Sequence, residues 1–401
     1  MWLHTHKFIF YMYNRTLQPQ IEEWLKTDMI LILYGARQVG KTTLAKKIAH
    51  KYDEEYFYVD CEEFINQGVL NSGSTAQIKA FIGSKKTIVF DEAQKVHNIG
   101  IALKLIHDHF PEVKVIATGS SSFDLANKIS EPLTGRNMKF QLYPLSLKEL
   151  TQQENIFVLG SNLINILRFG SYPKLIGLGP EQSIEVLKAL STDYVYRDVK
   201  ELIDIRNPQQ FKDLLKTLAF LIGQTVTYAD IAKKIGSDRE TVARYIDILE
   251  KAFIVKILRP LHRSHVREII HPFKVYFFDL GIRNSIIGNY TPIDNRDSRE
   301  VGALWENLCV IERFKLNEYG DPKVEKLKFG THKNYYFWRT KEASPKEYDL
   351  IEEADNKFQV FEMKWNGKKE SGVKKYDVFF ETYPNSELNV IHNENWWKWL
   401  L

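Results

Sequence analysis

Cysteine is scarce in this chain, and long apolar runs and a strong net charge are missing. Only Cys61 and Cys309 occur among the 401 residues, and their separation fits neither a disulfide framework nor a zinc site. No apolar run approaches the length of a membrane span. We therefore expect a protein of the reducing cytoplasm that has no disulfide, no zinc and no membrane partner.

The charge and the length leave the partners open. A formal net charge of +4 is compatible with a nucleic-acid partner but does not require one, because mild basicity mainly affects solubility. The length predicts roughly two to four domains. Residues 1–11 are aromatic, but they carry too little charge for a signal peptide and no small-residue cleavage site follows. Either Met1 or Met12 can therefore be the true start.

The most informative motif is a glycine-rich loop between an expected strand and an expected helix. An apolar run at 29–34 precedes residues 35–42, which match the pattern G-x-x-x-x-G-K-T. The glycines let backbone N–H groups point at phosphate oxygens, and the helix start adds partial positive charge. Lys41 is expected to reach the β- and γ-phosphates and Thr42 to hold Mg²⁺, whereas an ordinary turn would not explain this pair. The expected nucleotide-binding residues are Gly35, Ala36, Arg37, Gln38, Val39, Gly40, Lys41, Thr42 and Thr43.

A second expected strand ends in two carboxylates. Residues 87–90 are followed directly by Asp91 and Glu92. Asp91 suits the surroundings of a Mg²⁺ ion, and Glu92 suits the orientation or deprotonation of an attacking water. Such a pair also occurs on solvated loops, but together with the glycine-rich loop it favours hydrolysis of the nucleotide over binding alone.

Two stretches with different periodicity follow one another in the first half of the chain. From about residue 29 to 150, short apolar strands alternate with helical segments, which predicts a parallel α/β sheet. Residues 151–205 show the apolar spacing of helices.

The stretch 206–283 has the outline of a winged helix with a basic wing. Two expected capping boxes, at Thr227 and Ser237, open successive helices, and Gly236 lies in the turn between them. Two strands follow, at 253–258 and 274–278, and a basic loop joins them.

A DNA-binding interpretation would place helix 239–251 in a major groove and the basic loop on phosphates. The expected DNA contacts are Arg239, Arg244, Arg263 and Arg267. Winged helices also serve as protein–protein or interdomain modules, and acidic residues on the same helix dilute its positive field. Both interpretations stay open at this point.

The last part of the chain, residues 284–401, contains a possible metal site. An expected hairpin brings Asp349 beside Glu362 and leaves Lys364 on the same face as Glu362. The carboxylates could hold Mg²⁺, Lys364 could orient or help to deprotonate a water, and Glu306 could supply a third carboxylate. The pattern alone leaves an active nuclease, an inactive nuclease-like fold and a plain surface hairpin open.

From about residue 12 to near its end, the chain resembles a widespread prokaryotic family of predicted ATPases of the AAA+ superfamily. In that family a P-loop module is joined to a winged helix and to a C-terminal domain of unknown function that resembles restriction endonucleases. The resemblance is carried by the glycine-rich loop and by short motifs in a specific order. These are Asp91-Glu92-Ala93-Gln94, Thr118-Gly119-Ser120, Leu133-Thr134-Gly135-Arg136, 142–150, 170–173, Arg197-Asp198, 276–281, Trp305-Glu306-Asn307, 338–340 and Glu362-Met363-Lys364.

The resemblance implies an α/β fold with four units. These are a P-loop, parallel-sheet AAA+ ATPase core at 1–150, a helical lid at 151–205, a winged helix-turn-helix at 206–283 and a restriction-endonuclease-like α/β domain at 284–401.

The resemblance also implies ATP as the nucleotide and three further roles. Ser120 is similar to a sensor that contacts the γ-phosphate or its water, and Arg136 lies where AAA+ proteins carry the arginine finger of a neighbouring subunit. Such a finger would imply a homo-oligomer. Arg197 could act as a second sensor. Either arginine could instead form a surface salt bridge.

The expected function is Mg²⁺-dependent ATP hydrolysis, with Lys41, Glu92, Ser120 and Arg136 as the catalytic residues, coupled to action on DNA. Two alternatives remain. One is an ATP-dependent switch or signalling protein whose C-terminal units bind protein, and the other is an ATP-gated, metal-dependent nuclease.

Overall fold

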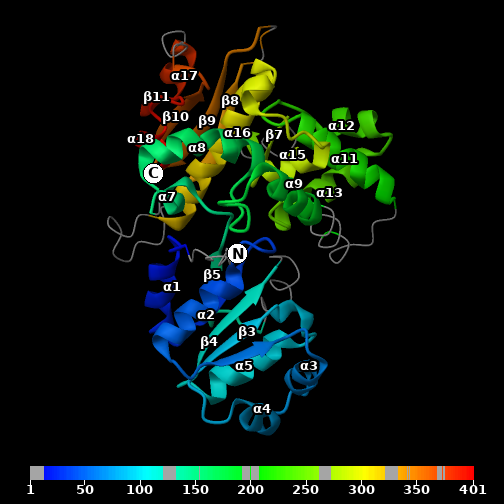
Figure 1. Ribbon diagram of the computed structural model, residues 1–401, viewed down its shortest axis with the longest axis vertical. Coiled ribbons are helices and arrows are strands. Elements are labelled where there is room, and N and C mark those ends of the chain that lie inside the picture. Colours follow the sequence, from blue (N-terminus) through cyan, green and yellow to red (C-terminus); the bar gives the residue numbers. More distant parts are fainter. Residues whose placement is uncertain are drawn as a thin grey trace, which may run out of the picture.

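The computed structural model shows two lobes (Figure 1). The residues that it describes are 13–120, 132–152, 154–191, 199, 207–261, 272–320, 333–340, 342, 344–367, 373 and 375–401. The lower lobe in Figure 1 holds the first sheet with its covering helices, and the upper lobe holds the second sheet and the remaining helices.

The first sheet consists of five parallel strands in the order β2-β3-β4-β1-β5. They are β1 (Ile30–Tyr34), β2 (Phe57–Asp60), β3 (Thr87–Asp91), β4 (Lys114–Gly119) and β5 (Asn137–Gln141). Every residue of β1 and β3 is buried, as expected for central strands of a parallel sheet with helices on both faces. The parallel α/β sheet predicted for residues 29–150 is confirmed.

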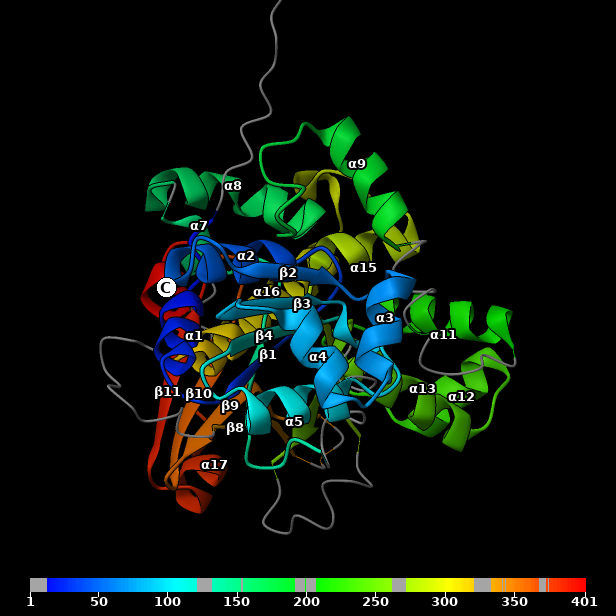
Figure 2. The ribbon, with the colours of Figure 1, turned by 90° about the horizontal axis from the view of Figure 1, so that it is seen from below.

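Within residues 13–120, six helical segments accompany this sheet. They are α1 (Gln18–Leu25), α2 (Lys41–Tyr52), α3 (Phe64–Asn71), α4 (Thr75–Ile82), the short 3₁₀ helix η1 (Ala93–Lys95) and α5 (Ile99–His109). Figure 1 shows α3 and α4 at the end of this lobe that lies away from the second lobe, and Figure 2, which looks at the molecule from below, shows them in front. This arrangement places the loop between β1 and α2 at the carboxyl edge of the strands.

The second lobe begins with helices and ends with a mixed sheet. Its helices are α7 (Leu147–Leu150), α8 (Ile156–Phe169), α9 (Pro180–Ala189), α11 (Pro208–Phe220), α12 (Tyr228–Ile235), α13 (Arg239–Lys251), α15 (Leu280–Ile287), η3 (Ile293–Asn295), α16 (Ser298–Tyr319), α17 (Asp377–Thr382) and α18 (Trp397–Leu400). Its strands are β6 (Val255–Pro260), β7 (Lys274–Phe277), β8 (Asn334–Arg339), β9 (Glu347–Ala354), β10 (Lys357–Met363) and β11 (Ser386–Ile391). Their order in the sheet is β11-β10-β9-β8-β6-β7.

The start of α12 agrees with the prediction and the start of α13 does not. Thr227 forms a complete capping box with Asp230, and Gly236 ends α12 in the left-handed region with φ of 64°. Helix α13, however, is capped by Asp238 and not by Ser237, since the Asp238 carboxylate accepts the backbone N–H of Thr241 at 2.7 Å. Aspartate is as good an N-cap as serine, so the sequence offered two adjacent N-cap residues. The predicted start of this helix was therefore one residue too early.

The hairpin of β6 and β7 is part of the same sheet as the C-terminal strands. β6 pairs with β7 in antiparallel fashion, and at its other edge Arg259 and Pro260 pair with Tyr336 and Phe337 of β8. One sheet therefore runs across the boundary predicted at residue 283. The winged-helix and nuclease-like assignments stay predictions for this lobe, and the predicted wing residues Arg263 and Arg267 lie outside the described residues, as does Arg197.

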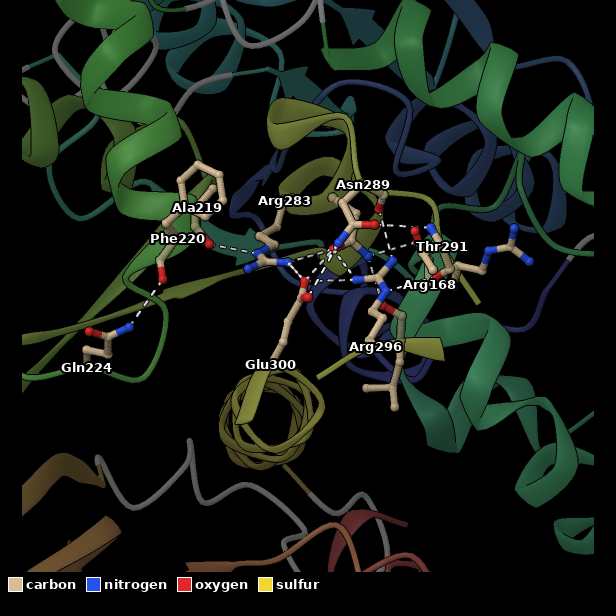
Figure 3. A network of polar contacts seen from close by, with 11 residues as sticks. Arg168, Ala219, Phe220, Gln224, Arg283, Asn289, Thr291, Arg296 and Glu300 are labelled. Atoms are coloured by element: carbon tan, nitrogen blue, oxygen red, sulfur yellow. Dashed lines mark hydrogen bonds and ion pairs between the residues drawn. The ribbon is translucent and has the colours of Figure 1, made fainter. Parts of the chain in front are cut away.

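A partly buried polar network joins helices of the second lobe to one another (Figure 3). Arg283 of α15 donates to the carbonyl of Ala219 at the end of α11 and forms an ion pair of 2.8 Å with Glu300 of α16. Arg296 reaches the same Glu300 carboxylate at 3.1 Å, and Arg168 of α8 donates to the carbonyl of Tyr290 at 2.6 Å. These contacts fix the helices that surround α16.

Candidate nucleotide site and the C-terminal charge cluster

The glycine-rich loop has the backbone geometry that its sequence predicts. Gly40 adopts φ of 99°, which favours glycine, and it directly precedes α2. A Cβ atom on Gly35 would overlap the carbonyl oxygen of Leu142, so this position requires glycine for close packing. The first turn of α2 carries no acidic residue that would compete with a phosphate.

The side chain of Lys41 is buried beneath the loop. Its ammonium donates to the carbonyls of Gly35 and Ala36 at 2.8 and 2.9 Å. These neutral acceptors can be exchanged for charged phosphate oxygens, which bind an ammonium more strongly. Lys41 is therefore placed to meet a phosphate at the loop.

The two residues predicted to hold Mg²⁺ are in direct contact. The Thr42 hydroxyl lies 2.9 and 3.0 Å from the two carboxylate oxygens of Asp91. Asp91 also accepts hydrogen bonds from the hydroxyls of Tyr58 and Thr118. A hydroxyl and a carboxylate oriented toward each other offer the oxygen ligands that Mg²⁺ prefers, so these residues fit the ion.

Tyr58 and Thr118 were not predicted as part of the site. Burial, followed by the hydrogen bond to Asp91, raises the pKa of Tyr58, so this phenol stays a proton donor to the carboxylate. Tyr58 lies on β2 and Thr118 on β4, the two strands that flank β3. Their role follows from strand order, which the sequence motif does not contain.

Gln94 connects Glu92 with Ser120. Its amide donates to the Glu92 carboxylate and, at 3.0 Å, to the Ser120 hydroxyl, and both Gln94 and Ser120 are buried. Glu92 itself has φ of 51°, an unusual value for a residue with a side chain, and its N–H donates to Thr118. The structure thus brings the predicted Glu92 and Ser120 to the same edge of the sheet as Lys41.

Arg136 lies at the opposite edge of the sheet. Its carbonyl accepts the N–H of Ile30 at the start of β1, whereas the glycine-rich loop follows the end of β1. Its side chain pairs with Asp108 at 2.9 Å on the surface. Any contact of Arg136 with a nucleotide would therefore involve another copy of the chain, and the arginine-finger role stays a prediction.

Two of the predicted DNA contacts lie on α13. Arg239 and Arg244 are solvent-exposed. Tyr245, the neighbour of Arg244 on this helix, is buried against Phe211 with 5.4 Å between ring centroids. Only part of the surface of α13 is therefore accessible to a partner.

The C-terminal hairpin brings Asp349 and Glu362 together as predicted. Their chain neighbours Leu350 and Phe361 are paired in the hairpin, and Asp349 accepts the N–H of Met363 at 2.8 Å. Lys364 forms an ion pair with Glu362. The hairpin geometry therefore agrees with the alternation of side chains in the sequence.

The buried Lys274 of β7 belongs to the same cluster and was missed. Its ammonium lies 2.6 Å from Glu347, 3.0 Å from Glu306 and 3.7 Å from Asp349. It has an exposed fraction of only 1%. Glu306 also accepts the hydroxyl of Tyr276 at 2.7 Å. The proposed third carboxylate is therefore engaged by a lysine and a tyrosine.

The residues present do not fit a metal site built from three carboxylates. No group of three or more His, Cys, Asp or Glu side chains within the described ranges is arranged to hold a metal ion. The role of Glu306 as a third carboxylate stays a prediction, and in the structure its carboxylate pairs with Lys274 at 3.0 Å. The pair Asp349 and Glu362 stays a prediction, and one oxygen of Glu362 is buried without a hydrogen-bond partner among the described residues.

The cluster makes folding sensitive to pH. Burial, together with the charge of Asp349, raises the pKa of Glu362 from 4.5 to about 8 and that of Glu306 from 4.5 to about 7. Between pH 4.5 and about 8, the carboxyl of Glu362 keeps its proton in the folded protein but has lost it in the unfolded chain. The free energy of unfolding therefore falls as the pH rises through this range. Glu362→Gln should flatten that decline because the amide does not titrate. Urea unfolding at several pH values measures it, and an unchanged slope in the variant would contradict the assignment.

Comparison with known proteins identifies three matching regions. Residues 27–151 match the sequence profile of a AAA domain. Residues 160–292 and residues 301–396 match two further domain families, and both are described as being of unknown function. The AAA part of the prediction is thereby confirmed, and the two C-terminal matches name neither a fold nor an activity.

Similar proteins span most of this chain. An uncharacterized protein of Methanocaldococcus jannaschii is 26% identical over an alignment 419 residues long. The alignment covers 96% of this chain and 91% of the Methanocaldococcus protein. An uncharacterized protein of Mycobacterium tuberculosis is 26% identical over 359 residues, with coverages of 88% and 74%.

Two solved structures show a distant likeness. The RuvB Holliday junction branch migration motor of Thermotoga maritima matches at 16% identity with a TM-score of 0.31, covering 61% of this chain and 89% of RuvB. A signal transduction ATPase with numerous domains from Pyrococcus horikoshii matches at 13% identity with a TM-score of 0.29, covering 75% of this chain and 45% of that protein.

Across the described part of the chain, no helix is both long enough and apolar enough to cross a membrane.

Proposed function

We propose that this protein is an ATPase that hydrolyses ATP with Mg²⁺ at the glycine-rich loop and couples the reaction to an action on DNA. The contact between Thr42 and Asp91, at 2.9 and 3.0 Å, is the observation that carries the proposal. It joins the loop to the strand end that also carries Glu92. The AAA-domain match over residues 27–151 supports the same conclusion.

Each residue of the site has a defined task in this proposal. Lys41 would exchange the carbonyls of Gly35 and Ala36 for the β- and γ-phosphates, and Thr42 and Asp91 would hold Mg²⁺. The bound ion neutralises charge on the triphosphate.

The water that attacks the γ-phosphate is assigned to Glu92 and Ser120. Glu92 would orient this water and accept its proton, and Ser120 would contact the γ-phosphate or the same water. Gln94 holds both side chains at one edge of the sheet. Arg136 would act only on the nucleotide of a neighbouring copy, which makes a homo-oligomer part of the proposal.

Substitution of the two exposed arginines of α13 tests the coupling of ATP hydrolysis to DNA. Duplex DNA at low salt should raise the rate of ATP hydrolysis, and Arg239→Ala combined with Arg244→Ala should reduce that stimulation because phosphate contacts are lost. Lys251→Ala is the matched control, since Lys251 is on the same helix but is paired with Asp247 at 2.7 Å. Equal stimulation in all three proteins would contradict a role for these arginines.

A switch that binds protein is the second candidate, and the second sheet favours it. Because β6 pairs with β8, the hairpin that follows α13 is built into the interior of the lobe. This is the use expected of an interdomain module. ATP hydrolysis with no response to DNA at low salt would support this candidate. We do not propose the nuclease alternative, because Lys274 pairs with Glu306 and Asp349, two of the three carboxylates that the predicted metal site would use.

A further inference from the structure

Arg15, which precedes α1, is buried against the glycine-rich loop. Its guanidinium donates to the carbonyl of Val39 at 2.6 Å, to the carbonyl of Tyr143 at 2.6 Å and to the carboxylate of Glu149 at 3.0 Å. Its exposed fraction is 6%, and that of Glu149 is 0%. Val39 directly precedes Gly40 and Lys41, so this side chain holds the part of the loop that leads into α2.

Tyr319, the last residue of α16, reaches the same point from the second lobe. Its hydroxyl accepts the backbone N–H of Tyr143 at 3.0 Å, and the carbonyl of the same Tyr143 accepts the Arg15 guanidinium at 2.6 Å. Gln20 of α1 donates to the carbonyl of Tyr319. The end of α16 is thereby attached to α1 and to Tyr143, which in turn accepts a hydrogen bond from Arg15.

Two further buried side chains of α16 hold the segment between β5 and α7. Glu312 accepts the N–H of Leu147 at 2.7 Å, and Lys315 donates to the carbonyl of Leu145 at 3.2 Å. Both side chains are almost fully buried and pair with each other at 2.8 Å. At its other end this segment packs on Gly35 through the carbonyl of Leu142. The segment therefore lies between the glycine-rich loop and α16 and is bound to both.

We infer that Arg15 is a positioning residue for the glycine-rich loop and that Tyr319 makes the position of this loop depend on α16. This inference rests on the proposed function. A change in how α16 sits, caused by a ligand on the second lobe, would change the affinity for ATP, and bound ATP would change the affinity for that ligand by the same factor. Glu92 and Ser120 lie on other elements, so the effect falls on ATP binding and not on the chemical step.

The chain offers a matched pair of variants to test this. Tyr319→Phe removes the hydroxyl that accepts the backbone N–H of Tyr143. Tyr143→Phe removes a hydroxyl from a ring 5.8 Å away, keeps the Tyr143 backbone, and deletes an oxygen that has no hydrogen-bond partner among the described residues. Both tyrosines are buried, so the two substitutions make similar demands on packing.

Tyr319→Phe should raise the KM for ATP by roughly threefold to tenfold, the size expected for one buried hydrogen bond, and leave kcat within about twofold. Tyr143→Phe should change neither. Arg15→Lys, which keeps the charge but cannot make all three contacts, should raise the KM further. Urea unfolding of each variant separates this from a structural role, which would lower stability without changing nucleotide affinity.

The outcomes separate this inference from the proposed function. If the wild type hydrolyses ATP but Tyr319→Phe and Tyr143→Phe have the same KM, or if Tyr319→Phe lowers kcat alone, the inference is overturned and the proposed function stands. If the wild type binds ADP or ATP without hydrolysis, the proposed function fails, and titration of both variants with a fluorescent ADP analogue still decides the inference. A wild type that binds neither nucleotide overturns both.

Discussion

Replacement of Glu92 by glutamine is expected to reduce ATP hydrolysis by about 100-fold or more while ATP affinity changes little. The magnitude is that of losing one positioned proton acceptor. Glutamine keeps the size and the hydrogen-bonding reach of the side chain, so the contact with Gln94 can persist. Phosphate release at saturating ATP measures the rate, and titration with a fluorescent nucleotide measures the affinity.

Lys41→Ala provides the contrast for this experiment. It removes the ammonium that is expected to reach the phosphates, so it should weaken ATP binding itself. A Glu92→Gln protein that still hydrolyses ATP at the wild-type rate would refute the assigned role of Glu92. A Lys41→Ala protein with unchanged affinity would show that the nucleotide lies elsewhere.

Lys274→Met is expected to lower the free energy of unfolding by roughly 3–5 kcal/mol near pH 8, the cost of breaking a buried ion pair by removing one partner. Methionine has a similar volume but leaves Glu306, Glu347 and Asp349 without their buried cation. The loss should be smaller at lower pH, where Glu306 gains a proton, because burial raises its pKa to about 7. Urea unfolding at two pH values measures both effects.

Lys364→Met is the control for this substitution. Lys364 belongs to the same cluster, but its side chain is 34% exposed and its ion pair in the described structure is with Glu362. A partly exposed pair typically contributes about 1 kcal/mol or less. Equal stability of Lys274→Met and the wild type would contradict the view that Lys274 is the internal cation of this cluster.

The nucleotide site was largely predictable because it is encoded by short, local patterns. Lys41 and Thr42 stand at fixed distances from Gly35, and Asp91 and Glu92 end a single apolar strand. The sequence also placed these elements on one sheet, where strands of the same direction bring their carboxyl ends to one edge. Gln94 belongs to one of the motifs that carry the family resemblance, but no role was predicted for it, although it lies two residues beyond Glu92.

The residues that sequence reasoning missed act across long distances in the chain. Arg15 contacts Glu149, and Lys274 contacts Glu347 and Asp349, so neither partner is visible from local spacing. A buried lysine also contradicts the usual expectation that lysine is exposed. The N-cap of α13 was missed for a different reason, because Ser237 and Asp238 are adjacent and equally suitable.

The central claim is that a triphosphate and Mg²⁺ bind where the glycine-rich loop meets Asp91. Calorimetric titration of the purified full chain with a non-hydrolysable ATP analogue, with and without Mg²⁺, tests it most directly. We predict saturable binding at one site per chain that Mg²⁺ strengthens and that Asp91→Asn makes insensitive to Mg²⁺. Absence of binding at millimolar analogue, or binding of equal strength in Lys41→Ala, would contradict the account.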